Sequence, residues 1–300
     1  MIVPVPRRHA LLRIAAAFAL PAVLGACSVG PTPGGGARRI TYGEHPSQFG
    51  ELTLPAGAEP RGVAVVVHGG FWRQPFGLEL GRPLAADLAG AGYAAWNIEY
   101  RRVGGDGGWP ATFEDVSAAL DLLAGPVQEA AGGPLPLDRV VAVGHSAGGH
   151  LATWLAARPG LPAGVPGADP AVRLRGVVSQ AGVLDLVDAE ERGVGAGAGA
   201  DLLGGGPDEV PDRYALASPI ARLPLGVPVV CVHGTADTNV PIRQSERFVA
   251  AAGEAARSAG GAHTGSVELV TLPGADHFAV IDPATDAWRA CREAADRLLG

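Results

Sequence analysis

Short runs of apolar, β-branched residues alternate with longer Ala- and Leu-rich runs along most of this chain. The short runs predict buried strands at 48–54, 62–67, 94–98, 139–143, 174–179, 227–232 and 267–272. The longer runs predict helices at 78–89, 112–123, 147–157, 242–255 and 284–299. Strands and helices that alternate in this way predict an α/β fold, in which a mostly parallel central sheet carries helices on both faces.

One segment, residues 183–217, breaks this alternation. It contains "GVGAGAGADLLGGGPDEVPDRYA", which is rich in glycine and proline. We expect either a small excursion over the sheet that acts as a partial lid, or a disordered insertion without a role. Residues 159–170, "PGLPAGVPGADP", are expected to form a loop.

The first 26 residues have the layout of a signal peptide. Arg7 and Arg8 precede an apolar run at 14–24 that is too short to span a membrane. The Gly/Pro-rich residues 27–39 then predict a linker, and the folded domain is expected at 40–300. Arg7 and Arg8 also resemble a twin-arginine export signal, although Ala10 departs from that pattern.

The end of the apolar run, Leu24-Gly25-Ala26-Cys27, resembles the lipobox of bacterial lipoproteins. This resemblance implies that the chain is cut before Cys27 and that the Cys27 thiol is lipidated. The protein would then be anchored on the outer face of a bacterial cell membrane. The alternative is an ordinary cleavage site with an incidental cysteine, which predicts a secreted or periplasmic protein.

Charge and residue usage exclude several classes of function. The net charge is −7, which argues against a nucleic-acid partner. The chain has no lysine, so a P-loop lysine, a Schiff base and a Ser-Lys dyad are excluded. The cysteines and histidines lack metal-ligand spacing, so we expect no metal and no cofactor. Cys231 and Cys291 are expected to be free core thiols, or to form a disulfide if the protein is exported.

A serine with small neighbours lies between a predicted strand and a predicted helix, in Gly144-His145-Ser146-Ala147-Gly148. The pattern is G-x-S-x-G, in which a tight strand-to-helix turn lifts the serine hydroxyl above the sheet edge. The helix that follows favours negative charge at its N-terminus. We therefore expect Ser146 to be a nucleophile.

A serine nucleophile needs a base that is itself held by an acid. Asp237 and His277 each follow a later predicted strand, so the chain has the order Ser146, Asp237, His277. With this order the chain resembles the α/β-hydrolases, a resemblance that implies a Ser-His-Asp triad. The weaker alternatives are His233 as the base and Asp185 or Asp276 as the acid. His145 and His150 are expected to pack locally.

A tetrahedral intermediate also needs hydrogen-bond donors for its oxyanion. The backbone N–H of Ala147 is one donor, and His68-Gly69-Gly70 leaves an early strand with the shape of a second donor loop. This loop resembles the HGGG-type oxyanion loop of esterases, with Phe71 in place of the third glycine. We expect donation from Gly70, Phe71 and Ala147, although a simple tight turn is the alternative.

Several further segments narrow the resemblance. "HGGFW", "GHSAGGHLA", "NIEYRR" and "HGTADTNVP" look like the branch that contains kynurenine formamidases, feruloyl-esterase-like proteins and hormone-sensitive-lipase relatives. The resemblance implies a serine esterase that cleaves small or medium carboxylic esters through an acyl-enzyme. The alternatives are a formamidase or amidase on an N-acyl aromatic amine, and a catalytically silent, surface-anchored binding protein. Phe71, Trp72 and Trp109 are candidates for the pocket walls or for ordinary packing.

Overall fold

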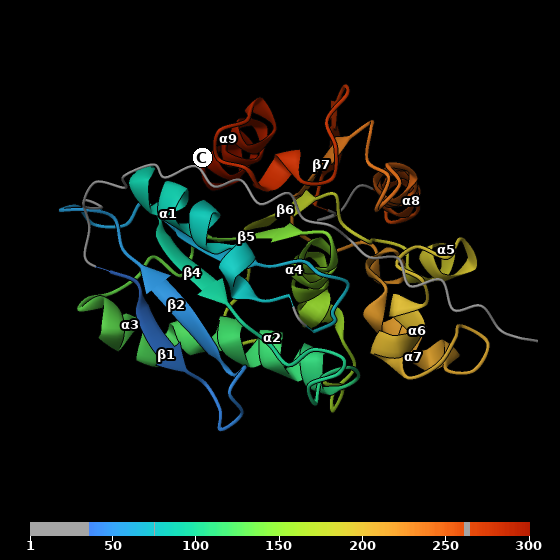
Figure 1. Ribbon diagram of the computed structural model, residues 1–300, viewed down its shortest axis with the longest axis horizontal. Coiled ribbons are helices and arrows are strands. Elements are labelled where there is room, and N and C mark those ends of the chain that lie inside the picture. The colour runs from blue at the N-terminus through green and yellow to red at the C-terminus, as the bar shows by residue number, and fades with distance from the viewer. Residues whose placement is uncertain (1–35, 75, 261–264) are drawn as a thin grey trace, which may run out of the picture. The chain divides into compact units, whose positions relative to one another are not determined.

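A computed structural model describes residues 36–74, 76–260 and 265–300, and its centre is one eight-stranded sheet (Figure 1). The strand order is β1-β2-β4-β3-β5-β6-β7-β8. The strands are β1 (Arg38–Thr41), β2 (Phe49–Thr53), β3 (Val63–Val67), β4 (Ala94–Ile98), β5 (Val140–His145), β6 (Gly176–Gln180), β7 (Val229–Gly234) and β8 (Val267–Leu272).

The sheet is mostly parallel, as the alternating pattern predicts. Strands β3 to β8 pair in parallel, whereas β1 pairs with β2 and β2 with β4 in antiparallel fashion. Strand β1 was not expected, and it begins at Arg38, so the last two residues of the predicted linker belong to the sheet. The predicted signal peptide and Cys27 lie outside the described residues.

Helices cover both faces of the sheet (Figure 1). One face carries α1 (Arg82–Gly90) and α9 (Asp286–Leu299). The other face carries α2 (Ala111–Asp121), α3 (Pro126–Ala131), α4 (Ala147–Ala157) and α8 (Arg243–Ser258). Short 3-10 turns are found at Leu78–Leu80, Leu122–Ala124, Arg158–Gly160, Pro219–Arg222 and Ala279–Ile281. No helix of the described ranges is long and apolar enough to cross a bilayer.

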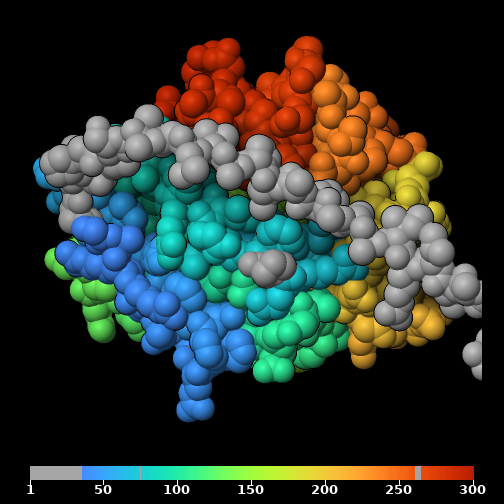
Figure 2. Space-filling view, viewed as in Figure 1, coloured from blue at the N-terminus to red at the C-terminus, as the bar shows by residue number. Residues whose placement is uncertain are grey.

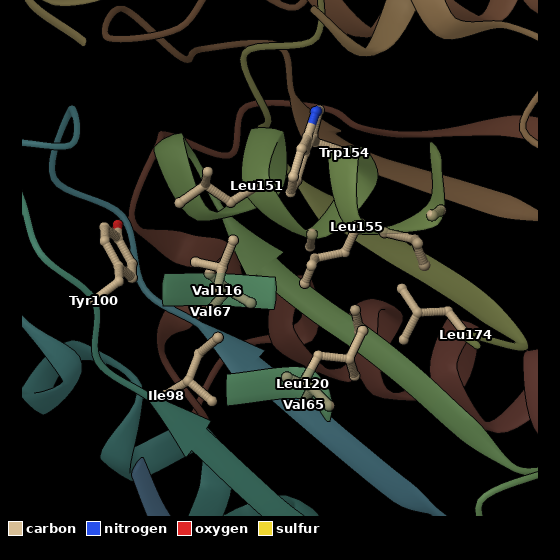
Figure 3. Close-up of a cluster of buried hydrophobic side chains, with 14 of the residues drawn as sticks. Val65, Val67, Ile98, Tyr100, Val116, Leu120, Leu151, Trp154, Leu155 and Leu174 are labelled. Carbon is tan, nitrogen blue, oxygen red and sulfur yellow. The ribbon is translucent and has the colours of Figure 1, made fainter. Parts of the chain in front are cut away.

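The two layers explain why the strands are apolar throughout rather than alternating. In β3, Val65 and Val67 belong to the core under α2 and α4, whereas Ala64 and Val66 belong to the core under α1 and α9. Figure 3 shows the first of these cores, with Val65 and Val67 beside Val116, Leu120 and Leu151. Successive side chains of a strand point to opposite faces, so a sheet covered on both sides needs apolar residues at every position.

The two cysteines that the structure describes are buried and unpaired. Cys231 lies in the core under α4 and α8, and Cys291 lies in the core under α1 and α9. Because the sheet separates the two thiols, the disulfide alternative is wrong.

The excursion at 183–217 folds into three short helices that pack on the domain. They are α5 (Leu186–Glu191), α6 (Ala198–Leu203) and α7 (Pro211–Ala217). Leu202, Leu203 and Tyr214 from this segment are buried in the main core. Its surface continues into that of α8 (Figure 2). The disordered-insertion alternative is therefore wrong.

Candidate active site

Ser146 sits at the turn between β5 and α4 in a strained backbone conformation. Its φ is 56° and its ψ is −118°, outside the regions that L-residues ordinarily populate. The turn is too tight for larger neighbours: a Cβ at Gly148 would lie 2.1 Å from the Val67 carbonyl oxygen, and one at Gly144 would lie 2.1 Å from the Gly148 carbonyl oxygen. Ser146 takes the N-cap position of α4, but its hydroxyl makes no cap hydrogen bond and stays available for chemistry.

Asp237 and His277 form a buried pair at the ends of β7 and β8. His277 Nδ1 lies 2.6 Å from Asp237 Oδ2. The other carboxylate oxygen accepts the N–H groups of Asn239 and Val240, both at 2.9 Å. Burial alone would raise the pKa of Asp237, but the hydrogen bonds from His233, His277 and Val240 hold that pKa well below its usual range. Asp237 is therefore an ionised acceptor that fixes the Nδ1–H tautomer of His277.

His145 connects this pair to the serine turn. Its Nε2–H donates to the His277 carbonyl oxygen at 2.9 Å, and the two imidazole rings lie 4.5 Å apart between centroids. Burial lowers the pKa of His145 to about 3, so the ring is neutral. Because His145 precedes Ser146, these contacts bring the Asp237–His277 pair to the same sheet edge as the serine.

The loop after β3 lies against Ser146 from the other side. A Cβ at Gly69 would come within 3.1 Å of the Ser146 Cβ and 2.9 Å of the His145 carbonyl oxygen. Gly70 and Phe71 follow with φ values of 112° and 51°. Ala147 is the first residue of α4, where a backbone N–H has no acceptor within its own helix. The three predicted donors therefore lie on the two segments that meet at Ser146.

His68 and two residues at the end of β4 hold this loop. His68 Nε2 lies 2.9 Å from Glu99 Oε1, and the His68 ring stacks on Tyr100 at 4.3 Å. Tyr100 in turn donates its hydroxyl proton to the His68 carbonyl oxygen at 2.9 Å. Burial would raise the pKa of Glu99, but the hydrogen bond and charge of His68 together with Arg102 keep it lowered. The segment "NIEYRR" contributed only to the family resemblance in the sequence, and this supporting role of Glu99 and Tyr100 was not predicted.

The weaker acid and base candidates make other contacts. His233 is buried, with Nδ1 2.8 Å from Ser245 Oγ and Nε2 2.9 Å from the Val240 carbonyl oxygen. Nε2 also lies 3.3 Å from Asp237 Oδ2, so His233 supports the acid. Asp185 caps α5 and pairs with Arg247 at 2.7 Å. Asp276 accepts the backbone N–H groups that follow it in its own loop. Neither of these two aspartates contacts His277 through its side chain in the described structure.

Two phenylalanines border the site and are the exposed large apolar side chains of the described residues. Phe76 is 45% exposed and packs so close to Gly70 that a Cβ there would clash with it. Phe278 is 58% exposed, and its ring lies 5.3 Å from that of His277. Trp72 is buried in the core, and Trp109 packs on Phe113, so for both tryptophans the packing interpretation agrees with the structure. Exposed apolar side chains therefore lie next to both Gly70 and His277.

Residues 51–251 match the BD-FAE family. The chain is 30% identical over 265 residues to the esterase LipC of Mycobacterium tuberculosis, an alignment that covers 82% of this chain and 61% of LipC. The chain thus spans about three fifths of the length of this curated relative.

Solved structures give the same fold. A thermophilic esterase from the planctomycete Thermogutta terrifontis superposes with a TM-score of 0.67 at 26% identity, over 88% of this chain and 92% of that one. A truncated carbohydrate esterase from gut microbiota superposes with a TM-score of 0.71 at 21% identity, over 90% of this chain and 97% of that one. At that lower identity the second match supports the fold alone.

Proposed function

This chain belongs to the BD-FAE family of α/β-hydrolase esterases, and we propose that it cleaves small or medium carboxylic esters through an acyl-enzyme on Ser146. The observation that carries the proposal is the buried Asp237–His277 pair, 2.6 Å apart, held beside the strained Ser146 turn by His145. A carboxylate, an imidazole and an uncapped serine hydroxyl at one sheet edge are the groups that serine acyl transfer requires.

In the proposed reaction His277 Nε2 takes the Ser146 proton as the hydroxyl oxygen attacks the ester carbonyl. Asp237 keeps the Nδ1–H tautomer and stabilises the imidazolium that forms. The N–H groups of Gly70, Phe71 and Ala147 stabilise the oxyanion. His277 then protonates the departing alcohol, and water attacks the acyl-enzyme with His277 again as the base.

Two observations favour short apolar acyl groups. Phe76 and Phe278 present exposed apolar surface beside Gly70 and His277. The Thermogutta terrifontis esterase has been solved with propionate and with butyrate bound, at 26% and 25% identity to this chain. We therefore expect acetate to butyrate esters to be hydrolysed faster than esters of charged acids.

The experiment that tests the proposal compares Ser146→Ala with a matched serine variant on 4-nitrophenyl butyrate. Ser146→Ala should lower kcat/KM by on the order of 10³-fold or more, because triad members act as a unit. Ser179→Ala, at the end of the neighbouring strand, removes a buried hydroxyl without a hydrogen-bond partner and should leave kcat/KM within about twofold. Equal activities of the two variants would remove Ser146 from the mechanism.

We also propose that the protein is exported and lipid-anchored through Cys27. The support is the sequence alone, in which Leu24-Gly25-Ala26-Cys27 follows an apolar run. Metabolic labelling with a fatty-acid probe tests this proposal. Label should be incorporated into the wild-type protein and lost in Cys27→Ala, and label that persists in the variant would contradict the anchor.

A further inference from the structure

The proposed oxyanion loop has a backbone that its own sequence does not favour. Gly70, Phe71 and Trp72 have φ values of 112°, 51° and 56°, so three consecutive residues lie in the left-handed region. Aromatic residues rarely adopt this conformation, and it persists only where surrounding contacts enforce it. The contacts that hold Trp72 therefore decide where the Phe71 and Gly70 N–H groups point.

A buried hydrogen-bond relay holds Trp72. Its indole Nε1–H donates to His150 Nδ1 at 3.2 Å, and His150 Nε2–H donates to the Ala217 carbonyl oxygen at 2.9 Å. Trp72 and His150 are 1% and 0% exposed. The relay joins three segments that are distant in sequence: the loop after β3, helix α4 directly behind Ser146, and the C-terminal end of α7 in the excursion.

The two hydrogen bonds of His150 require one protonation state. Nδ1 accepts from Trp72, so it carries no proton, and Nε2 donates, so it carries one. Burial lowers the pKa of His150 to about 4, against the opposite effect of the Ala217 carbonyl. The neutral tautomer that the geometry needs is therefore the one present at neutral pH.

Arg73 connects the same loop to the excursion at a second point. Its guanidinium donates to the carbonyl oxygens of Gly195 and Ala196 at 2.9 and 3.0 Å, and to the Asp201 carboxylate at 2.6 Å. The Phe71 ring also packs on Gly195, where an added Cβ would lie 2.5 Å from a ring carbon. The excursion thus contacts the side chains of Phe71 and Arg73 directly, and it is linked to Trp72 through His150.

We infer that Trp72 and His150 are positioning residues that hold the oxyanion loop in its active conformation, with α7 as the fixed support. This inference rests on the proposed esterase function and deepens it. The inference gives the excursion a different role from that of a lid. Residues 183–217 hold the donor loop in place and do not cover the substrate. Neither Trp72 nor His150 contacts the reacting atoms.

The test compares two Trp→Phe variants that each remove one indole N–H. Trp72→Phe breaks the relay. Trp154→Phe breaks a similar 3.0 Å hydrogen bond from α4 to the carbonyl oxygen of Leu216, the residue before Ala217 on α7. We expect Trp72→Phe to lower kcat for 4-nitrophenyl butyrate by about 10- to 100-fold with little change in KM, somewhat less than the loss of an oxyanion donor. Trp154→Phe should keep kcat within about twofold.

A second readout separates loop positioning from general destabilisation. A trifluoromethyl ketone forms a tetrahedral adduct, so its affinity should fall in Trp72→Phe by the same factor as kcat. In the double variant with His150→Leu, the loss should be no larger than in either single variant, because both break one relay. If Trp72→Phe does not fold, a comparison of two His150 variants provides the same test. His150→Asn keeps a hydrogen-bond acceptor near the Nδ1 position, so it should retain a higher kcat than His150→Leu.

Failure of the inference and failure of the proposed function give different results in these experiments. Equal kcat and inhibitor affinity in Trp72→Phe and Trp154→Phe, with an active wild type, would overturn the inference and leave the proposed function intact. A wild-type protein without any esterase activity would overturn the proposed function and the inference with it.

Discussion

Ser146 has a backbone conformation that costs free energy, and its neighbours are the residues that tolerate it. Its positive φ is held by the hydrogen bond from its N–H to the Gln180 carbonyl oxygen at 2.8 Å and by the close approach of β3 to Gly148. Strain of this kind, of the order of 1–3 kcal/mol per residue, persists where the fold over-determines the position. The glycines of the G-x-S-x-G pattern are therefore required by packing.

Replacing Gly148 tests this packing requirement. Gly148→Ala would place a Cβ 2.1 Å from the Val67 carbonyl oxygen, so β3 and α4 would have to separate. We expect a loss of about 2 kcal/mol or more in the free energy of unfolding, together with loss of most ester hydrolysis. Gly133→Ala is the control, because its Cβ would meet nothing within 4 Å. Similar urea midpoints for the two variants would contradict this account.

At this scale the sequence order predicted which residues should lie near one another but not their supports. Ser146, Asp237 and His277 follow strands in a recognisable order, and the structure shows the Asp237–His277 pair in contact with His145, the residue before Ser146. The catalytic roles of the three residues stay a prediction. His145 and His150 could only be said to flank the serine, because their partners, the carbonyl groups of His277 and Ala217, lie 132 and 67 residues away. Hydrogen bonds of such long range depend on the tertiary structure and leave no local pattern.

At the scale of elements, apolar periodicity predicted the strands and helices that carry a clear apolar pattern. The strands at 94–98 and 267–272 and the helix at 147–157 have the expected bounds. The missed elements are short or lack an apolar stripe: β1 reads "RRIT", α3 is six residues long, and α6 is flanked by the left-handed glycines Gly197 and Gly204. Glycine is common at helix ends, where it adopts a left-handed conformation, and it is also common in disordered segments. Composition alone therefore could not distinguish short helices from disorder.

The excursion also makes a prediction about kinetics. Both α6 and α7 place side chains in the main core, and Arg73 hydrogen-bonds the proposed oxyanion loop to α6. We therefore expect that no lid has to open at an oil–water interface. We expect the rate of tributyrin hydrolysis to rise smoothly with concentration and to show no jump above the solubility limit. The same assay with a lipase that shows interfacial activation provides the control. An abrupt rise for this protein would mean that the excursion moves.

At the scale of the whole molecule, two buried neutral histidines link folding to pH. The pKa values of His145 and His150 are lowered to about 3 and about 4, whereas an unfolded histidine titrates near 6.5. Between these values the unfolded chain binds protons that the folded chain does not, so stability must fall as the pH falls below about 6.5.

The size of this pH effect on stability can be measured by urea unfolding. The free energy of unfolding should drop by roughly 2 kcal/mol per histidine between pH 7 and pH 5. His150→Asn should show a smaller drop, because it lacks one of the two titrating groups. A free energy of unfolding that stays constant or rises toward pH 5 would show that the His145 and His150 rings are not buried in the neutral form.

The central claim is that Ser146 is a nucleophile activated by His277 and Asp237, and a fluorophosphonate probe tests it most directly. After reaction with the folded protein, peptide mass spectrometry should locate one adduct on Ser146. The labelling rate should fall on the order of 10³-fold in His277→Gln and strongly in Asp237→Asn, while Asp276→Asn should react like the wild type. No adduct on Ser146 in the folded wild-type protein, or equal labelling rates in the His277→Gln variant, would contradict the account.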